Sequence, residues 1–352
     1  MARTRIAVIA SFVLLAVGML ATQHRPARAC GGFFTRSVLT AERRPSLAYE
    51  QVLIVHDAAK NREHFIREVA FRKADEPFGF VVPTPARPEV DKVTKSPFLA
   101  LRTLFPFDPP TIGMARGVIG SGYGSGAGAG FGGRGSVEVL EETKVGSFTA
   151  FVLKADDEQA LAGWLRDHDL QTTPESEAWL AHYVKLKFFY VAMRYDPPKR
   201  KRDDDANAPL AAETIRISFD TPVPFYPYLE PTSTETRDDP RVLDLWMVGT
   251  HAVTPIALRE QGGEREWIRP LRTGEQKDDV RDQLTGIEPS IDATLPEGTL
   301  IVQTFQDQKR SRAGIGDILF APSTKRELAT DDRAALVPLL GILDPALVEG
   351  SR

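Results

Sequence analysis

The chain has 352 residues, of which 42% are hydrophobic and 26% are charged, and its formal net charge is −4 at pH 7. This hydrophobic fraction is sufficient for globular cores, and the length suits two domains of about 150 residues each. A mildly acidic chain is a poor ligand for nucleic acid and for anionic lipid surfaces, so we expect neither as a partner.

Residues 1–29 predict a secretory signal peptide. Two arginines precede an apolar run over residues 6–21, and Ala27 and Ala29 supply the small residues that a signal peptidase requires. Cleavage after Ala29 would make Cys30 the first residue and change the formal net charge to −8, because the leader holds four arginines and no acid. The run is shorter than the roughly 20 residues of a transmembrane helix, and no later stretch approaches that length. We therefore expect a periplasmic or extracellular protein without a transmembrane span in the mature chain.

Cys30 is the only cysteine, so no disulfide can form within one chain. A lipid anchor at Cys30 is the less favoured alternative, because the mostly small or polar residues 22–29 separate it from the apolar run. A thiol beside its own α-amino group is also a potential nucleophile. The following Gly31 and Gly32 argue against this role, because they give the thiol a flexible attachment.

Strands dominate the first part of the mature chain. Residues 49–56 and 64–73 predict a hairpin, and residues 78–82 predict a third strand that ends at Pro83. Ser96-Pro97 is a typical helix start. Further strands are expected over 136–140, 145–153 and 186–195, with helices that begin at Asp156-Asp157 and near Ser176.

A glycine-rich loop interrupts these elements. Ten of the nineteen residues from 117 to 135 are glycine. The loop contains Gly128-x-Gly130-x-x-Gly133, the dinucleotide-binding pattern, but no βαβ unit surrounds it. A solvated tether is the better interpretation, and we expect no cofactor.

A polar linker over residues 196–210 predicts a domain boundary, because it combines prolines with opposed runs of basic and acidic residues. The N-terminal domain would span residues 30–195. The C-terminal domain, residues 211–352, would be β-rich, with strands over 214–219, 242–249 and 299–305 and a short terminal helix after Asp331. The expected fold class is α+β, with antiparallel sheets and a few packed helices in two sub-domains.

Aromatic residues alternate with prolines just beyond the linker. Phe225, Tyr226 and Tyr228 in an extended backbone would present a surface for a ligand or partner. The alternative, which we favour, is a strand at the edge of the domain whose rings pack inward.

Histidines offer one candidate metal pairing. His56 and His64 flank the predicted hairpin and would face each other across it. Without a third ligand in view we expect no metal site.

Five short segments occur along the chain in a fixed order: Cys30-Gly31-Gly32-Phe33-Phe34, residues 78–86, residues 137–146, the helix with Ala160-Leu161-x-x-Trp164-Leu165, and residues 183–189. Together they resemble the bacterial domain-of-unknown-function 2330 family. The resemblance covers residues 30–227 and implies an exported envelope protein without an established activity.

Two functions remain open at this stage. The first is a non-enzymatic binding or structural protein of the envelope, whose partner is another protein or a small molecule. The alternative is a periplasmic hydrolase that uses Cys30 or a site assembled from distant residues. No motif supplies a nucleophile together with a base and an oxyanion donor, so we expect no catalytic residue and favour the first function.

Overall fold

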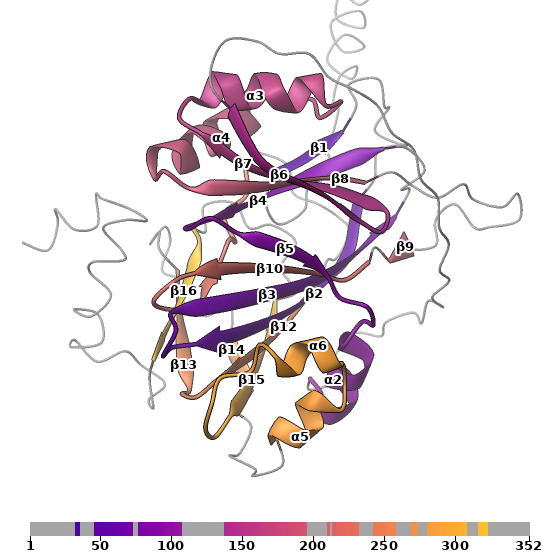
Figure 1. The fold of residues 1–352 in the computed structure, drawn as a ribbon, viewed down its shortest axis with the longest axis vertical. Helices are drawn as coiled ribbons and strands as arrows, with labels where there is room; N and C mark the ends of the chain where they lie inside the picture. Colours follow the sequence, from indigo (N-terminus) through magenta and orange to yellow (C-terminus); the bar gives the residue numbers. More distant parts are fainter. Residues whose placement is uncertain are drawn as a thin grey trace, which may run out of the picture.

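The computed structural model describes residues 32–35, 46–72, 77–107, 137–195, 210–211, 213–231, 242–257, 269–273, 280–307 and 316–322. Three sheets and five helices form its layers (Figure 1). The expected α+β class is confirmed. Cys30, the glycine-rich loop, most of the linker and the expected terminal helix lie outside the described residues.

The first sheet has five antiparallel strands in the order β1-β4-β8-β7-β6. Their bounds are Gly32–Thr35 for β1, Phe78–Thr84 for β4, Phe189–Tyr195 for β8, Phe148–Ala155 for β7 and Val137–Val145 for β6. The residues between the two strands expected at 136–140 and 145–153 therefore belong to β6, and the chain reverses at Gly146 and Ser147. Gly146 has φ of +58°, a left-handed backbone conformation that strains residues with a Cβ, so this turn favours glycine.

Pro83 does not end its strand, contrary to expectation. It lies within β4 opposite Tyr190 of β8, whereas β1 pairs only with residues 78–81. Among the described residues, Pro83 therefore pairs with a strand on one side only, a position at which its missing N–H is tolerated.

The second sheet has eight strands, with the order β14-β15-β12-β2-β3-β10-β5 and with β9 paired to β3. The bounds are Arg269–Thr273 for β14, Ile301–Asp307 for β15, Val242–Gly249 for β12, Ser46–Asp57 for β2, Arg62–Arg72 for β3, Ile215–Asp220 for β10, Glu89–Lys92 for β5 and Leu210–Ala211 for β9. The expected hairpin is confirmed as β2 and β3. The pair β2 and β12 is parallel, which the expected antiparallel arrangement did not include.

The expected boundary at residues 196–210 does not divide the sheets. Strands from before it (β2, β3 and β5) and after it (β10, β12, β14 and β15) pair in the same eight-stranded sheet. One continuous core also joins residues from both sides, for example Phe80 and Val191 with Ile217 and Leu245. The division into an N-terminal and a C-terminal sub-domain therefore does not describe how the sheets form.

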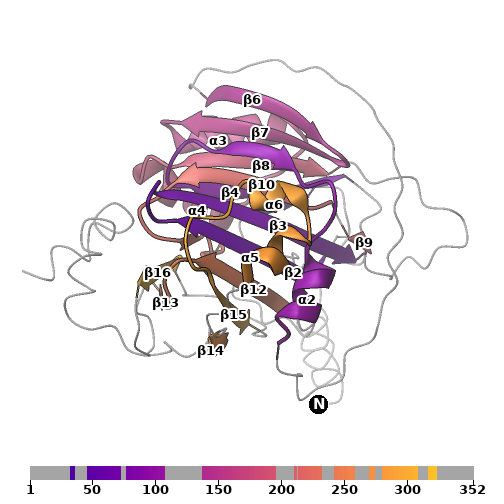
Figure 2. The ribbon, with the colours of Figure 1, turned by 60° about the horizontal axis from the view of Figure 1, so that its bottom comes forward.

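The two large sheets lie face to face, and helices cover both outer faces (Figures 1 and 2). Helices α3 (Glu158–Asp167) and α4 (Pro174–Lys185) cover the five-stranded sheet. Helices α2 (Phe98–Leu104), α5 (Val280–Thr285) and α6 (Pro289–Asp292) cover the eight-stranded sheet, where Leu101 and Leu284 join Trp246 in a second core. A third sheet, β11-β16-β13, lies at one side, with bounds Phe225–Tyr226, Ile318–Pro322 and Val253–Ala257.

Candidate functional site

The space between the large sheets holds charged side chains as well as apolar ones. Arg67 Nε lies 2.7 Å from Glu50 Oε1, and the two side chains are only 2% and 1% exposed. The guanidinium of Arg67 also lies 4.8 Å from the ring centre of Phe80. Because both charges are buried and directed at each other, this pair serves to hold β2 and β3 in register rather than to meet a ligand.

The aromatic segment after the linker belongs to this interior. Phe225, Tyr226 and Tyr228 are all 0% exposed, so they form no docking surface, and the inward-packing alternative describes them. The Tyr228 hydroxyl donates a hydrogen bond to Asp307 Oδ2, and burial raises the pKa of Tyr226 well above its usual value. Asp307, on the distant strand β15, accepts the hydrogen bond that allows the Tyr228 ring to be buried together with its hydroxyl group.

His56 and His64 point to opposite faces of the eight-stranded sheet. In the hairpin register His56 lies opposite Glu63, whereas His64 lies opposite Val55, and neighbouring positions of a strand alternate between faces. The two imidazoles therefore cannot share a metal ion. Among the described residues, no group of three histidine, cysteine or acidic side chains is arranged to hold one.

His64 and Ser218 form a serine–histidine pair that sequence analysis did not identify. His64 Nδ1 lies 2.8 Å from Ser218 Oγ across the neighbouring strands β3 and β10. Ser218 is 1% exposed, and burial, with help from Arg216 and Arg62, lowers the pKa of His64 to about 4. A buried hydroxyl beside so weak a base does not suit general-base catalysis near neutral pH, so this pair is structural.

Helix α2 is held to its sheet by a polar cluster. Arg102 Nη2 donates to Asp244 Oδ2 at 2.6 Å, and Gln306 Nε2 donates to Asp244 Oδ1 at 2.7 Å. Asp244 is 2% exposed, and burial raises the pKa of its carboxyl group. These contacts fasten α2 over the second core and leave Asp244 inaccessible to a ligand.

An aromatic cluster lies at the surface where α3 crosses the five-stranded sheet. The rings of Trp164 and His168 stack with their centres 3.8 Å apart, and both meet the edge of Phe151 at 5.1 and 5.4 Å. His168 Nδ1 donates to the Trp164 carbonyl oxygen at 2.8 Å, which fixes the stack. Trp164 and His168 are partly exposed, so this cluster is accessible to a partner.

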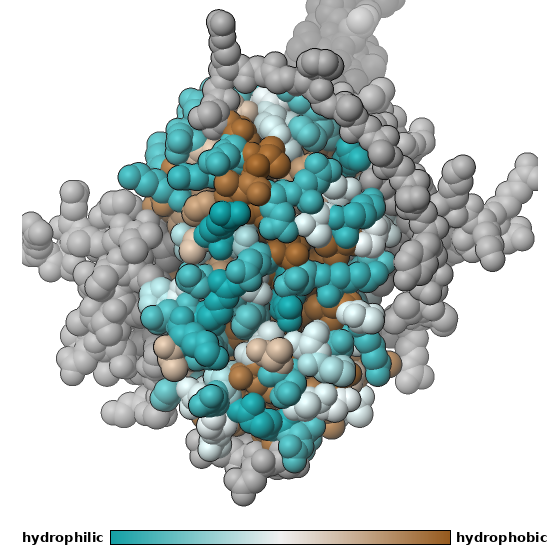
Figure 3. All heavy atoms as spheres, in the orientation of Figure 1, coloured by the Kyte–Doolittle hydropathy of each residue, from teal (hydrophilic) through white to brown (hydrophobic). Residues whose placement is uncertain are grey.

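The neighbouring strand β6 extends this surface. Val139 is 45% exposed and lies opposite Leu153, two residues along β7 from Phe151, so it is on the same face of the sheet as the aromatic cluster. Figure 3 shows hydrophobic side chains gathered in the region of α3 and β6 and bordered by hydrophilic residues. We call Val137, Val139, Phe151, Trp164 and His168 the outer patch.

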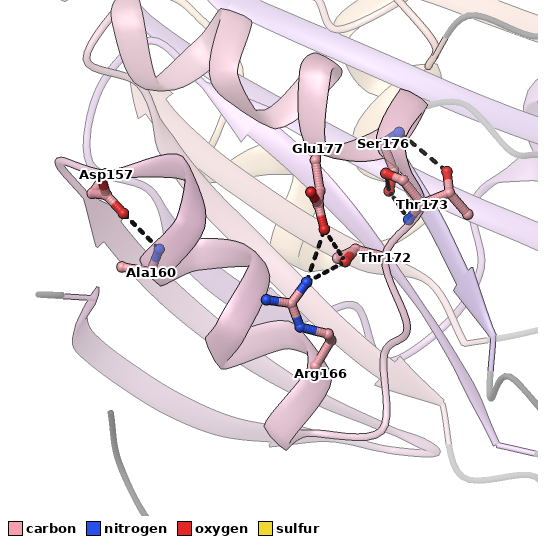
Figure 4. A network of polar contacts seen from close by, with 7 residues as sticks. All are labelled: Asp157, Ala160, Arg166, Thr172, Thr173, Ser176 and Glu177. Atoms are coloured by element: carbon pink, nitrogen blue, oxygen red, sulfur yellow. Dashed lines mark hydrogen bonds and ion pairs between the residues drawn. The ribbon is translucent and has the colours of Figure 1, made fainter. Parts of the chain in front are cut away.

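The helix that carries Trp164 is rigidly placed by its caps and by α4 (Figure 4). Asp157 caps α3 by accepting a hydrogen bond from the Ala160 amide at 2.7 Å, as the sequence predicts. At the other end, Arg166 Nη1 lies 2.8 Å from Glu177 Oε1 of α4. The outer patch is therefore built on fixed elements, which favours its use as a binding surface.

None of the helices in the described ranges is both long and apolar enough to cross a membrane. Ala27, Ala29 and Cys30, the residues expected at the cleavage site, lie outside those ranges, so the expected cleavage and the alternative of a lipid anchor stay predictions.

Comparison with known proteins identifies the family. A family model described as "Uncharacterized protein conserved in bacteria (DUF2330)" matches residues 26–269. The chain belongs to this family. The resemblance seen in the sequence is thereby confirmed, and the match extends beyond the residue 227 at which the resemblance was expected to weaken.

Other comparisons add little. No curated protein matches the chain. Among solved structures, the crystal structure of baculovirus P35 is similar over 81% of this chain and 98% of that one, with 8% sequence identity and a TM-score of 0.36. A likeness at that level carries no functional inference.

Proposed function

We propose that this DUF2330 protein is exported to the bacterial cell envelope and acts there by binding a partner at the outer patch, without catalysis. The observation that carries the proposal is the contrast between polar and apolar groups in the described part of the chain. Buried polar groups such as Asp244, Asp307 and His56 make hydrogen bonds within the fold. Val139 and the Trp164–His168 stack, in contrast, are accessible on a rigid support.

Export is supported by the leader-like residues 1–29, in which a basic start, an apolar run and the small residues Ala27 and Ala29 follow one another. A protein that leaves the cytoplasm with one cysteine must be stable without an internal disulfide. The two large cores, with helices on both outer faces, supply such stability by packing alone.

Mass spectrometry of the full chain, expressed with its leader in a Gram-negative host, tests both parts of the proposal. The denatured protein from the periplasmic fraction should begin at an unacylated Cys30. The native protein should carry additional mass that is lost on denaturation. Protein that stays in the cytoplasm with its leader intact would contradict export. A mass increased by acyl chains would show that the exported protein is lipid-anchored rather than free.

A matched pair of variants tests whether the binding occurs at the outer patch. Val139→Asp should abolish the additional mass, because a charge is introduced at an exposed apolar contact. Ala59→Asp, at the exposed β2–β3 turn, should leave it unchanged. Equal retention of the additional mass by both variants would contradict the assignment of the outer patch.

A further inference from the structure

We propose that β6 receives an extended, basic polypeptide segment of the partner as an added edge strand, with apolar side chains of that segment against the outer patch. This inference rests on the proposed function and specifies the chemistry of the partner.

The first observation is the position of β6 at the edge of its sheet. The strand closes the five-stranded sheet and pairs with β7 alone among the strands of the described ranges. With nine residues, Val137–Val145, it is long enough for a ladder of several hydrogen bonds. An edge strand presents unpaired backbone N–H and C=O groups that can pair with another chain. Strand addition of this kind derives its affinity from the main chain and its specificity from alternate side chains.

The second observation is the apolar surface beside that edge. Val137 and Val139 lie opposite Ala155 and Leu153 on the face that α3 partly covers, and Val139 is 45% exposed. Alternate side chains of an added strand would continue this face and reach Val139. The partner segment should therefore carry an apolar residue at every second position.

The third observation is charge. The stretch from Val137 to Asp169, which comprises β6, β7 and α3, contains eight acidic and three basic side chains, a net charge of −5 at pH 7. Glu138, Glu142, Asp167 and Asp169 are all exposed. An extended segment whose other positions carry lysine or arginine complements this field, and complementary charge speeds association and selects the partner.

The same acids exclude a second copy of this chain as the occupant. Self-pairing of β6 would bring Glu138, Glu141 and Glu142 of two molecules together, and like charges across neighbouring strands are destabilising. A basic segment avoids this repulsion, so the edge of β6 favours a basic partner over a second copy of the chain.

A short fluorescent peptide in which lysine alternates with valine is the probe, and fluorescence anisotropy with the full mature chain is the measurement. The peptide should bind, and hydrogen exchange should slow at the amides of β6. The same peptide with alternate backbone nitrogens methylated should not bind, because its charge and side chains are retained while its main-chain donors are lost. Equal binding of the methylated peptide would overturn strand addition.

Charge variants provide the second arm. Glu138→Gln/Glu142→Gln should weaken binding by about threefold to tenfold, because exposed ion pairs each contribute a factor of about five or less. The control Asp282→Asn/Glu297→Gln removes two exposed acids from the layer of α5 and α6 and should change nothing. An unchanged affinity in the β6 variant, or no peptide binding at all, would overturn the basic partner.

Failure of this inference can be told apart from failure of the proposed function. If no basic peptide binds but the native protein still loses a Val139-dependent mass on denaturation, binding at the outer patch stands and the partner chemistry is wrong. If both results are negative, both proposals are wrong.

Discussion

Replacing Arg67 with methionine should cost much of the stability of the fold. The change removes the guanidinium charge, keeps an unbranched apolar stem in place of the arginine stem, and leaves the Glu50 carboxylate without its buried counter-charge. Because the two side chains are 2% and 1% exposed and 2.7 Å apart, the relevant precedent is a broken buried ion pair, which costs about 3–5 kcal/mol. A surface pair would be worth only about 1 kcal/mol or less.

Urea unfolding followed by tryptophan fluorescence gives the free energy of unfolding directly, and an unchanged slope with urea would show that the unfolded state is the same. The corresponding fall in Tm is roughly 6–20 °C, at 2–4 °C per kcal/mol for a cooperative unit of about 150–250 residues.

Two further variants isolate the pair. Arg166→Met removes the exposed partner of Glu177 and should lose about 1 kcal/mol or less. The double variant Glu50→Gln/Arg67→Met should be more stable than Arg67→Met alone, because no uncompensated charge stays buried. If Arg67→Met and Arg166→Met cost the same, or the double variant is the least stable, the assignment of a buried, paired charge is refuted.

Three smaller effects follow from local contacts. Burial raises the pKa of Glu63 well above its usual value, so the folded protein keeps this proton at pH values where the unfolded chain has lost it, and the parent loses stability as pH rises through the folded pKa. Glu63→Gln has no such proton and should therefore gain stability relative to the parent between pH 5 and 8. An equal dependence of the two free energies of unfolding on pH would contradict this. Burial lowers the pKa of His64 to about 4, so the unfolded chain takes up this proton before the folded protein does, and the protein should lose stability as pH falls from about 6.5 to 4. His64→Asn should reduce this loss, as measured by acid unfolding curves. Asp157→Ala should cost about 1 kcal/mol by removing the cap of α3, whereas the exposed neighbour Asp156→Ala should cost less than half of that, and equal costs in urea unfolding would reject the capping role.

Local signals in the sequence predicted many elements well. The β2–β3 hairpin follows from alternation of apolar residues, and α3 begins at its predicted cap because an aspartate there satisfies amides of the first turn. These features depend on neighbours within a few residues, so they are visible without the fold.

Features that depend on distant partners were missed. The polar residues Glu141–Lys144 suggested an interruption, but an edge strand such as β6 tolerates charges because one side of it is solvated. The parallel pairing of β2 with β12 joins segments on either side of the linker, which composition alone cannot reveal. The burial of Tyr228 likewise depends on Asp307, a residue far along the chain.

For the candidate site, the sequence placed Trp164 in a predicted helix but did not single it out as a site residue. The spacing of four between Trp164 and His168 was the available signal, because residues four apart are neighbours on one side of a helix. The exposure of Val139 could not be predicted, since it depends on β6 being the last strand of its sheet.

Site-specific photo-crosslinking in living cells tests binding at the outer patch most directly. A photoreactive phenylalanine at position 139 should form a crosslink to one discrete envelope component in the native host, whereas the same group at exposed position 59 should form none. The crosslink at position 139 should disappear when Trp164 is replaced by aspartate in the same chain. No crosslink at position 139, or the same product from both positions, would contradict the account.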